Sequence, residues 1–238
     1  LNCVGQMQER LNANPVPLQL PIGAEADFVG IIDLIAMKAN IYDEKSVNGE
    51  KFDVVDIPEN CRQLADEYRG KLIEAAADID DAIMDKFLGG EEISPEKITA
   101  AVRKGALELK ITPVLCGAAF KNKGVQQLLD AVVTFLPSPL DVPPIQGTHP
   151  KTEKEIIRKS ENAAPLSALA FKIMTDPFVG QLAFVRVYSG ELKSGSYVYN
   201  STTNQRERVG RLLRMHSNKR EEITSVGAGD IGAVIGLK

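Results

Sequence analysis

Apolar residues in the first half of the chain recur every three or four positions, which predicts a series of amphipathic helices. The apolar face of the fourth helix is formed by Ile98, Val102 and Leu109. The predicted helical segments are Leu1–Ala13, Asn60–Ala77, Ile79–Phe87 with Gly89-Gly90 after it, Ser94–Leu109 and Gly124–Phe135.

Runs of β-forming residues alternate with these helices. Val16–Leu20 predicts a short strand, and Phe28–Asp33 and Met37–Ile41 predict a hairpin. Ile111–Cys116 predicts a buried strand that leads through the small-residue turn Gly117-Ala118-Ala119 into the last helix. A strand, a tight loop and a helix in this order form the carboxyl-end crevice of an α/β sheet, where ligands usually bind.

The second half of the chain has a different pattern of residues. Prolines and charged residues between Leu136 and Pro165 predict a semi-rigid connector. After Pro165, short β-rich runs alternate with turn signals, which predicts a small barrel or sandwich. The runs are Leu169–Met174, Leu182–Tyr188, Tyr197–Tyr199, Arg208–Leu213 and Ile231–Ile235, and the turns are Asp176-Pro177, Ser189-Gly190, Lys193–Gly195, Thr203-Asn204 and Gly227–Asp230.

Composition is that of a globular protein, since 44% of the 238 residues are hydrophobic and 25% are charged. No apolar run approaches the roughly 20 residues of a membrane span, and no signal-peptide pattern is present. The three cysteines are widely spaced and form neither a disulfide framework nor a zinc pattern. This favours a reduced, cytosolic setting.

Charge is unevenly distributed along the chain. Residues 1–159 carry 18 basic and 25 acidic side chains, a net charge of −7, and residues 160–238 carry 10 and 7, a net charge of +3. The asymmetry suggests two modules with different partners, although an ordinary solvated surface explains it equally well. The acidic helices between Asp43 and Glu96 could dock a basic partner, but a solvated face is the favoured interpretation.

The turn Gly117–Lys121 is the best chemical candidate. Guanine carries a carbonyl where adenine carries an amino group, so a backbone N–H aimed at that oxygen selects guanine, and small side chains allow a close approach. On these residues alone, a turn whose small side chains serve packing is the favoured alternative.

A basic cluster lies further along the chain. At strand spacing, Arg206, Arg208, Arg214 and His216 share one face and Arg211 lies on the other. Such a surface could bind phosphates of structured RNA, or it could be an edge strand protected from aggregation by its charges, and the two interpretations have equal weight.

Other motifs are excluded. The glycine-rich stretch Gly227–Lys238 lacks the G-x-x-x-x-G-K-[ST] spacing of a phosphate loop. Asp27–Gly30 fits the short D-x-x-G pattern of a switch loop, but it lies in a predicted hairpin. His149 and His216 stand outside any metal-ligand pattern, and no nucleophile–histidine arrangement is suggested. We therefore assign no catalytic and no metal-ligating residue.

Four segments closely resemble the bacterial elongation factor G family. They are PVPLQLPIGAEADFVGIIDLIAMKA (Pro15–Ala39), ITPVLCGAAFKNKGVQQLLDAVVTFLPSPLDVPP (Ile111–Pro144), FKIMTDPFVGQLAFVRVYSGELKSGSYVYN (Phe171–Asn200) and RVGRLLRMHSNKREEI (Arg208–Ile223). They occur in the family's order.

The resemblance implies an α/β fold, a partial P-loop GTPase-like domain with an α+β insert, followed by a small, incomplete β-barrel. Residues 1–142 are similar to the C-terminal half of the GTPase domain, with the G-prime insert at about 14–104. Residues 143–238 are similar to most of the second domain, the translation-factor β-barrel. The family's phosphate loop, switch regions and Asn-Lys-x-Asp loop have no counterpart in this sequence.

In function, the resemblance implies an internal fragment of a ribosomal translocase, which binds and hydrolyses GTP with Mg²⁺ to move transfer and messenger RNA. Only the guanine-side loop remains, where Ala118, Ala119 and Phe120 occupy the family's Ser-Ala-Leu or Ser-Ala-Lys. The N–H of Ala119 would contact guanine, whereas Ala118 lacks the usual hydroxyl, which puts the supporting hydrogen bond of that hydroxyl in doubt. The fragment alone is expected to hold no nucleotide and to be inactive.

The resemblance also implies the ribosome as partner. The barrel would contact small-subunit ribosomal RNA, with Arg206, Arg208, Arg211 and Arg214 as candidate contacts, and the acidic insert would contact the large-subunit stalk protein. We expect a cytoplasmic monomer without membrane contact. The alternatives are another translational GTPase, of release-factor or ribosomal-protection type, and a non-enzymatic module that binds the ribosome or RNA.

Overall fold

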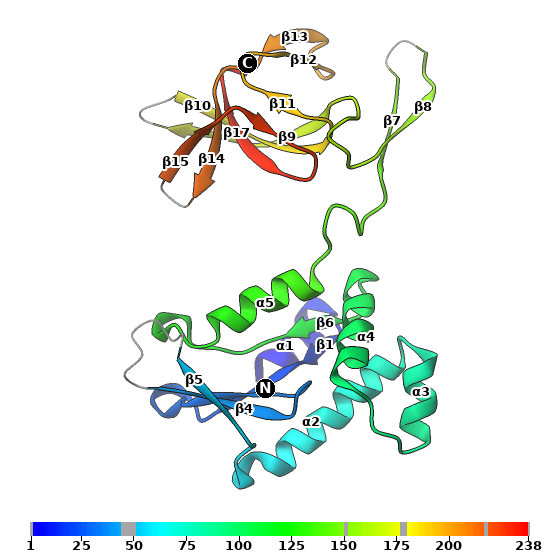
Figure 1. Cartoon of the computed structure of the whole chain (residues 1–238), viewed down its shortest axis with the longest axis vertical. Helices are drawn as coiled ribbons and strands as arrows, with labels where there is room; N and C mark the ends of the chain where they lie inside the picture. Colours follow the sequence, from blue (N-terminus) through cyan, green and yellow to red (C-terminus); the bar gives the residue numbers. More distant parts are fainter. Residues whose placement is uncertain (1, 44–50, 150–151, 177–179, 217–218, 238) are drawn as a thin grey trace. The chain divides into compact units, whose positions relative to one another are not determined.

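The computed structural model describes residues 2–43, 51–149, 152–176, 180–216 and 219–237. The chain forms two compact units, Leu1–Leu136 and Pro137–Lys238, which Figure 1 shows with their elements labelled. The predicted domain boundary, between residues 142 and 143, falls in the proline-rich start of the second unit. In the described residues, no helix has the length and apolar character needed to cross a bilayer.

The helices of the first unit follow the apolar periodicity of the sequence. One expectation is wrong: Leu109, assigned to the apolar face of the fourth helix, lies beyond the end of that helix and is 92% exposed. Its backbone has a positive φ of 57°, which ends the helical path. The helices are α1 (Asn2–Leu11), α2 (Glu59–Ala77), α3 (Asp81–Leu88), α4 (Pro95–Leu107) and α5 (Val125–Phe135).

The strands of the first unit form two sheets. β2 (Gln19–Ile22), β3 (Gly30–Asp33), β4 (Lys38–Tyr42) and β5 (Phe52–Val55) make an antiparallel sheet in that order. The predicted hairpin is therefore confirmed as the β3–β4 pair. β1 (Pro15–Pro17) and β6 (Thr112–Val114) make a parallel pair, with Pro15 opposite Thr112. The parallel pairing brings the chain back beside β1 after the whole excursion through β2–β5 and α2–α4.

Two strand expectations in this unit need correction. The single strand predicted at Val16–Leu20 is divided at Leu18, because β1 pairs in parallel with β6 while β2 pairs antiparallel with β3. β5 falls in a segment that the sequence pattern assigns to helices, yet it pairs with β4 and completes the sheet. Its side chains are largely exposed, so it carries no strong apolar signal.

One continuous core holds the first unit together. Buried side chains from β1, β2, β3 and β4 pack with those of α2, α3, α4 and the end of α5, and Leu72, Ile83, Ile98 and Val102 are almost fully buried. The Arg69 guanidinium of α2 also donates to the backbone oxygen of Ile35 at 2.9 Å, which ties the helix to the turn between β3 and β4.

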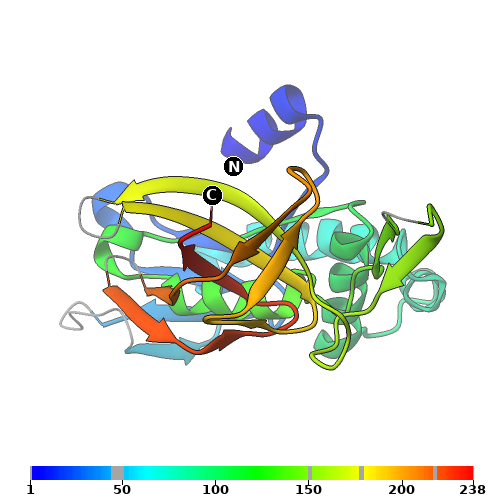
Figure 2. The same cartoon turned by 90° about the horizontal axis from the view of Figure 1, so that it is seen from above.

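The second unit consists of strands. A five-stranded antiparallel sheet has the order β15-β14-β17-β10-β9, and its two long strands, β9 and β10, curve side by side (Figure 2). Shorter pairs are β7–β8, β11–β16 and β12–β13. The strands are β7 (Ile145–Thr148), β8 (Glu155–Arg158), β9 (Ser167–Asp176), β10 (Gly180–Ser189), β11 (Leu192–Lys193), β12 (Tyr197–Asn200), β13 (Gln205–Arg208), β14 (Leu212–His216), β15 (Lys219–Ile223), β16 (Ser225–Val226) and β17 (Ile231–Ile235).

The connector predicted between Leu136 and Pro165 is only partly irregular. It contains the β7–β8 hairpin, in which Ile145 lies opposite Arg158, between the prolines that precede β7 and Pro165. These four-residue strands are too short and too polar to show alternation. Pro150 and Lys151 of this segment, and Pro177 of the predicted Asp176-Pro177 turn, lie outside the described residues.

The fold class agrees with the expectation of mixed helices and strands followed by a strand-rich unit. Val185, Val187, Leu212 and Val234 form the centre of the second unit's core. In the described residues, the strands of this unit do not close into one continuous barrel.

Candidate functional site

The segment from Cys116 to Gly124 joins β6 to α5 in a closed loop. Ala118 and Lys123 form an isolated antiparallel bridge, with N···O distances of 2.9 Å and 3.2 Å. Between them lies η2 (Ala119–Lys121), a single turn of 3-10 helix. Ala118 and Ala119 are thus presented at the start of a turn, where backbone N–H groups have no helical acceptor.

Two glycines permit this closure. Gly124 has a φ of +84°, and a Cβ there would lie 2.9 Å from the Cys116 oxygen. A Cβ on Gly117 would lie 2.8 Å from the Lys123 oxygen. Side chains at either position would push apart the two ends of the loop.

The predicted site residues differ in their environment. Ala118 is partly buried, whereas Ala119 and Phe120 are exposed. The N–H of Ala119 makes no hydrogen bond to any other residue of the described ranges. The loop therefore offers a free backbone donor at Ala119, next to the small side chain of Ala118.

Residues distant in sequence support the loop, and sequence reasoning missed them. Lys123 Nζ donates to the Phe28 oxygen at 3.1 Å and lies 5.9 Å and 6.0 Å from the ring centres of Phe28 and Tyr42. The Tyr42 hydroxyl bonds to Gln127 Oε1 of α5 at 3.1 Å. The only local signal of this support is the lysine-rich character of the loop, because its partners come from the β2–β5 sheet.

The surroundings of the loop are apolar. Phe28, Ile31 and Tyr42 form a small core against which Cys116 and Ala118 pack. Burial raises the pKa of the Cys116 thiol to about 11, so the side chain is a neutral packing group at physiological pH. Burial also raises the pKa of Tyr42, against the smaller opposing effect of its hydrogen bonds with Gly124 and Gln127.

The phosphate and metal parts of a nucleotide site have no counterpart beside this loop. The sequence contains no G-x-x-x-x-G-K-[ST] segment. In the ranges that the structure describes, no group of three or more His, Cys, Asp or Glu side chains is placed to hold a metal ion.

The basic residues do not share a single face, contrary to the expectation from strand spacing. Arg206 and Arg208 lie on β13, which pairs with β12, whereas Arg214 and His216 lie on β14 of the larger sheet. The chain leaves strand geometry between the two, and Arg211 falls in that connection. The cluster is therefore two separate pairs joined by an irregular segment.

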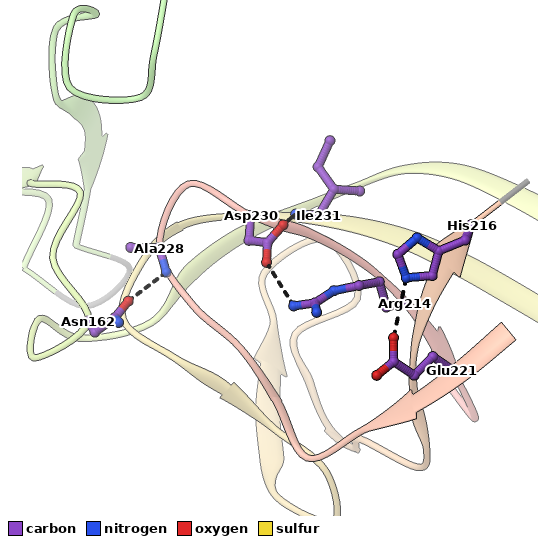
Figure 3. A network of polar contacts seen from close by, with 7 residues as sticks. All are labelled: Asn162, Arg214, His216, Glu221, Ala228, Asp230 and Ile231. Carbon is purple, nitrogen blue, oxygen red and sulfur yellow. Dashed lines mark hydrogen bonds and ion pairs between the residues drawn. The ribbon is translucent and has the colours of Figure 1, made fainter. Parts of the chain in front are cut away.

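The two pairs have different environments. The Arg206 guanidinium stacks on the Tyr197 ring, 4.2 Å from its centre. Arg214 lies 3.7 Å from Asp230, and His216 lies 3.2 Å from Glu221, as the dashed lines in Figure 3 show. The charge of Arg214 is therefore partly compensated, and the charges of Arg206 and Arg208 on β13 are better placed to meet a polyanion.

The acidic helices present a solvated surface. Exposed ion pairs join Arg62 to Asp66 and Lys71 to Glu67 on α2, each one turn apart. Such pairs contribute little to stability individually, and most acidic side chains of the insert remain exposed to solvent.

Comparison with known proteins gives a match for the second unit. Residues 165–238 match the family model of elongation factor G domain 2. This part of the chain is thus similar to domain 2 of elongation factor G. The match begins at the end of the proline-rich segment and includes β9 to β17, so Arg206, Arg208, Arg211 and Arg214 all lie inside the matched segment.

The fold of the whole chain resembles that of a solved protein from Thermus thermophilus. The two chains superpose with a TM-score of 0.72 at 24% identity, over 98% of this chain and 32% of the Thermus chain. The chain thus spans about a third of the length of that protein. The likeness extends over both units, whereas the match to elongation factor G domain 2 covers only the second.

Proposed function

We propose that this chain is part of a translational GTPase that binds and hydrolyses GTP on the ribosome and promotes movement of transfer and messenger RNA. The observation that carries the proposal is the match of residues 165–238 to elongation factor G domain 2. The first unit is consistent with the proposal, because the loop between β6 and α5 is closed by the Ala118–Lys123 bridge and begins with small residues.

The guanine side of the nucleotide would be held by Ala118, Ala119 and Phe120. The N–H of Ala119 is the proposed donor to the guanine carbonyl, and the adjacent small side chains leave room for the base. Ala118 has no hydroxyl, so the loop depends on the Ala118–Lys123 bridge and on Lys123 for its shape. GTP or GDP with Mg²⁺ would supply the phosphoryl group and its charge neutralisation, and the phosphate ligands would come from outside this sequence.

The ribosome is the proposed partner. Arg206 and Arg208 of the β12–β13 hairpin are candidate contacts to small-subunit ribosomal RNA, and Arg211 and Arg214, further along the chain, are additional candidates. The acidic surface of α2, α3 and α4 is the candidate contact for the large-subunit stalk protein. Opposite charges on these two surfaces suit two different partners, one polyanionic and one basic.

The experiment that tests the proposal is GTP hydrolysis by the full-length protein that contains this chain, with and without bacterial ribosomes. We expect multiple turnovers that depend on ribosomes, because a translational GTPase is completed by its ribosomal site. Hydrolysis that ribosomes do not stimulate would contradict the translational assignment. Absence of any GTP binding would instead favour a module that binds the ribosome without catalysis.

A further inference from the structure

A hollow of about 270 Å³ lies in the second unit, between the base of the β7–β8 hairpin and β10. The proline-rich segment before β7 forms one wall, and residues 158–161 at the end of β8 form another. Arg186 and Tyr188 of β10 line it together, because residues two apart on a strand point to the same face.

The hollow has an unbalanced positive charge. Arg158, Lys159 and Arg186 line it, against one carboxylate, that of Glu161. Within the described ranges, none of the three basic side chains has an acidic partner within 4.0 Å. Three cations gathered at one concave surface repel each other unless an anion joins them.

Arg186 is the most constrained of the three. Its guanidinium lies over the Tyr188 ring, 5.2 Å from the ring centre. Its Nε is shielded from solvent and has no hydrogen-bond partner among the described residues. The positive charge of this guanidinium is therefore not balanced by an acidic partner. An anion in the hollow could accept hydrogen bonds from its other N–H groups.

The walls are preformed. Gly229 has a φ of +87°, and a Cβ there would lie 2.7 Å from Pro139, so the β16–β17 loop packs closely against the proline-rich segment. The N–H of Ala228 donates to Asn162 Oδ1 at 2.8 Å, which holds the same loop to the segment after β8 (Figure 3). The N–H of Gly190 donates to the backbone oxygen of Glu161 at 2.9 Å. A site built in this way loses little entropy when a ligand binds.

We propose that this hollow binds the phosphate group of a nucleotide. Arginine matches phosphate oxygens with a planar fork of donors, and Arg158 and Lys159 add charge at the rim. The volume lies at the lower limit of small-molecule pockets, which suits one phosphate with its sugar rather than a larger ligand. The phosphate could belong to a free nucleotide or to the backbone of single-stranded RNA. The site is independent of the guanine-side loop and of Arg206–Arg214.

The test is a titration of the 238-residue chain, followed by amide chemical shifts, with three probes: inorganic phosphate, uridine 5′-monophosphate, and a short oligouridylate without a terminal phosphate. We expect shifts at Arg158, Lys159 and Arg186. Arg186→Gln should weaken binding about tenfold or more, because a charged hydrogen bond is lost. The double variant R158Q/K159Q, altered at the rim, should also weaken it, and Lys172→Gln on β9 is the matched control.

The probes separate the two sources of phosphate. Binding of inorganic phosphate and the mononucleotide supports a free nucleotide, and binding of the oligouridylate alone supports an RNA backbone. The proposal is overturned if no probe shifts these residues, or if R158Q/K159Q binds as tightly as the unaltered chain. The second variant decides the matter even if Arg186→Gln fails to fold.

Discussion

Gly124 occupies a crowded point of the loop between β6 and α5. Its φ of +84° lies in the left-handed region, and three atoms stand within 3.1 Å of the position where a Cβ would be placed. The predicted guanine-side turn depends on this residue as much as on Ala118 and Ala119. The sequence shows a glycine at the start of a helix, but the crowding around it comes from Ile31 and Cys116 and is visible only in the fold.

Replacing Gly124 with alanine should destabilise the first unit by about 1–3 kcal/mol, because the positive φ is strained for alanine and the Cβ collides with backbone. Urea denaturation followed by circular dichroism measures the change. The control is Gly70→Ala in α2, where nothing lies within 4 Å of the added Cβ. That variant should be more stable than the unaltered chain by about 0.5–1 kcal/mol. Equal stability of the two variants would contradict the loop geometry.

Cys116 provides a test of burial beside the same loop. Its pKa of about 11 lies above the ordinary value of 9.0 because burial disfavours the thiolate. The native state therefore holds the thiol proton more tightly than the unfolded state, so this contribution to stability is present below pH 9 and is lost as pH rises from 9 to 11.

Alkylation by iodoacetamide, followed for each cysteine by mass spectrometry, should reflect this difference. Between pH 7 and 9 we expect Cys116 to react far more slowly than Cys3, which is exposed. In urea the two rates should converge. Equal rates in the native protein would show that the Cys116 thiol is accessible.

Elements with a strong apolar period could be predicted from the sequence, and elements held mainly by pairing could not. α2, α3, α4 and α5 appear where the periodicity places them, because each buries one face. β5 and the β7–β8 hairpin do not, since their stability comes from neighbouring strands rather than from their own side chains.

The core of the insert gives a quantitative test at the scale of elements. Leu72 of α2 is 1% exposed, and its truncation to alanine should cost about 2–5 kcal/mol of unfolding free energy because a cavity remains. Leu109→Ala is the control, since Leu109 is 92% exposed and its loss should change stability by about 0.5 kcal/mol or less. Urea midpoints measure both. A large loss of stability in Leu109→Ala would show that Leu109 packs on the apolar face of the helix, as the sequence predicted.

The β12–β13 hairpin carries the prediction on RNA. If Arg206 and Arg208 contact phosphates, the double variant R206A/R208A should bind structured RNA more weakly and lower the salt dependence of log K by about 1.5–2. Fluorescence anisotropy at several salt concentrations measures this, with Lys172→Ala on β9 as control. An unchanged slope would indicate that the charges serve only to protect an edge strand.

At the scale of the whole molecule, the sequence predicts features that depend on neighbouring residues and misses features that depend on contacts between distant residues. The sequence identifies the turn at Ala118–Phe120 because its small residues are contiguous, whereas Lys123 reaches Phe28 and Gln127 reaches Tyr42 across most of the unit. It also identifies a strand-rich second half, but it cannot show that Arg206 and Arg214 belong to different sheets. Both the support of the loop and the separation of the two arginines depend on contacts between residues that are distant in the sequence.

At the largest scale, we propose that this chain supplies the guanine side of a GTPase nucleotide site, and that the phosphate ligands of that site come from elsewhere in the protein. Base contacts without phosphate and magnesium ligands give little affinity, since most nucleotide binding energy comes from the phosphates.

The most direct test is calorimetric titration of GDP, with ADP as control, into the 238-residue chain and into the full-length protein that contains it. We predict that the chain alone does not distinguish GDP from ADP, because any phosphate binding in the hollow of the second unit is blind to the base, and that the full-length protein binds GDP in preference to ADP. A preference of the isolated chain for GDP with micromolar affinity, or equal affinity of the full-length protein for GDP and ADP, would contradict this prediction.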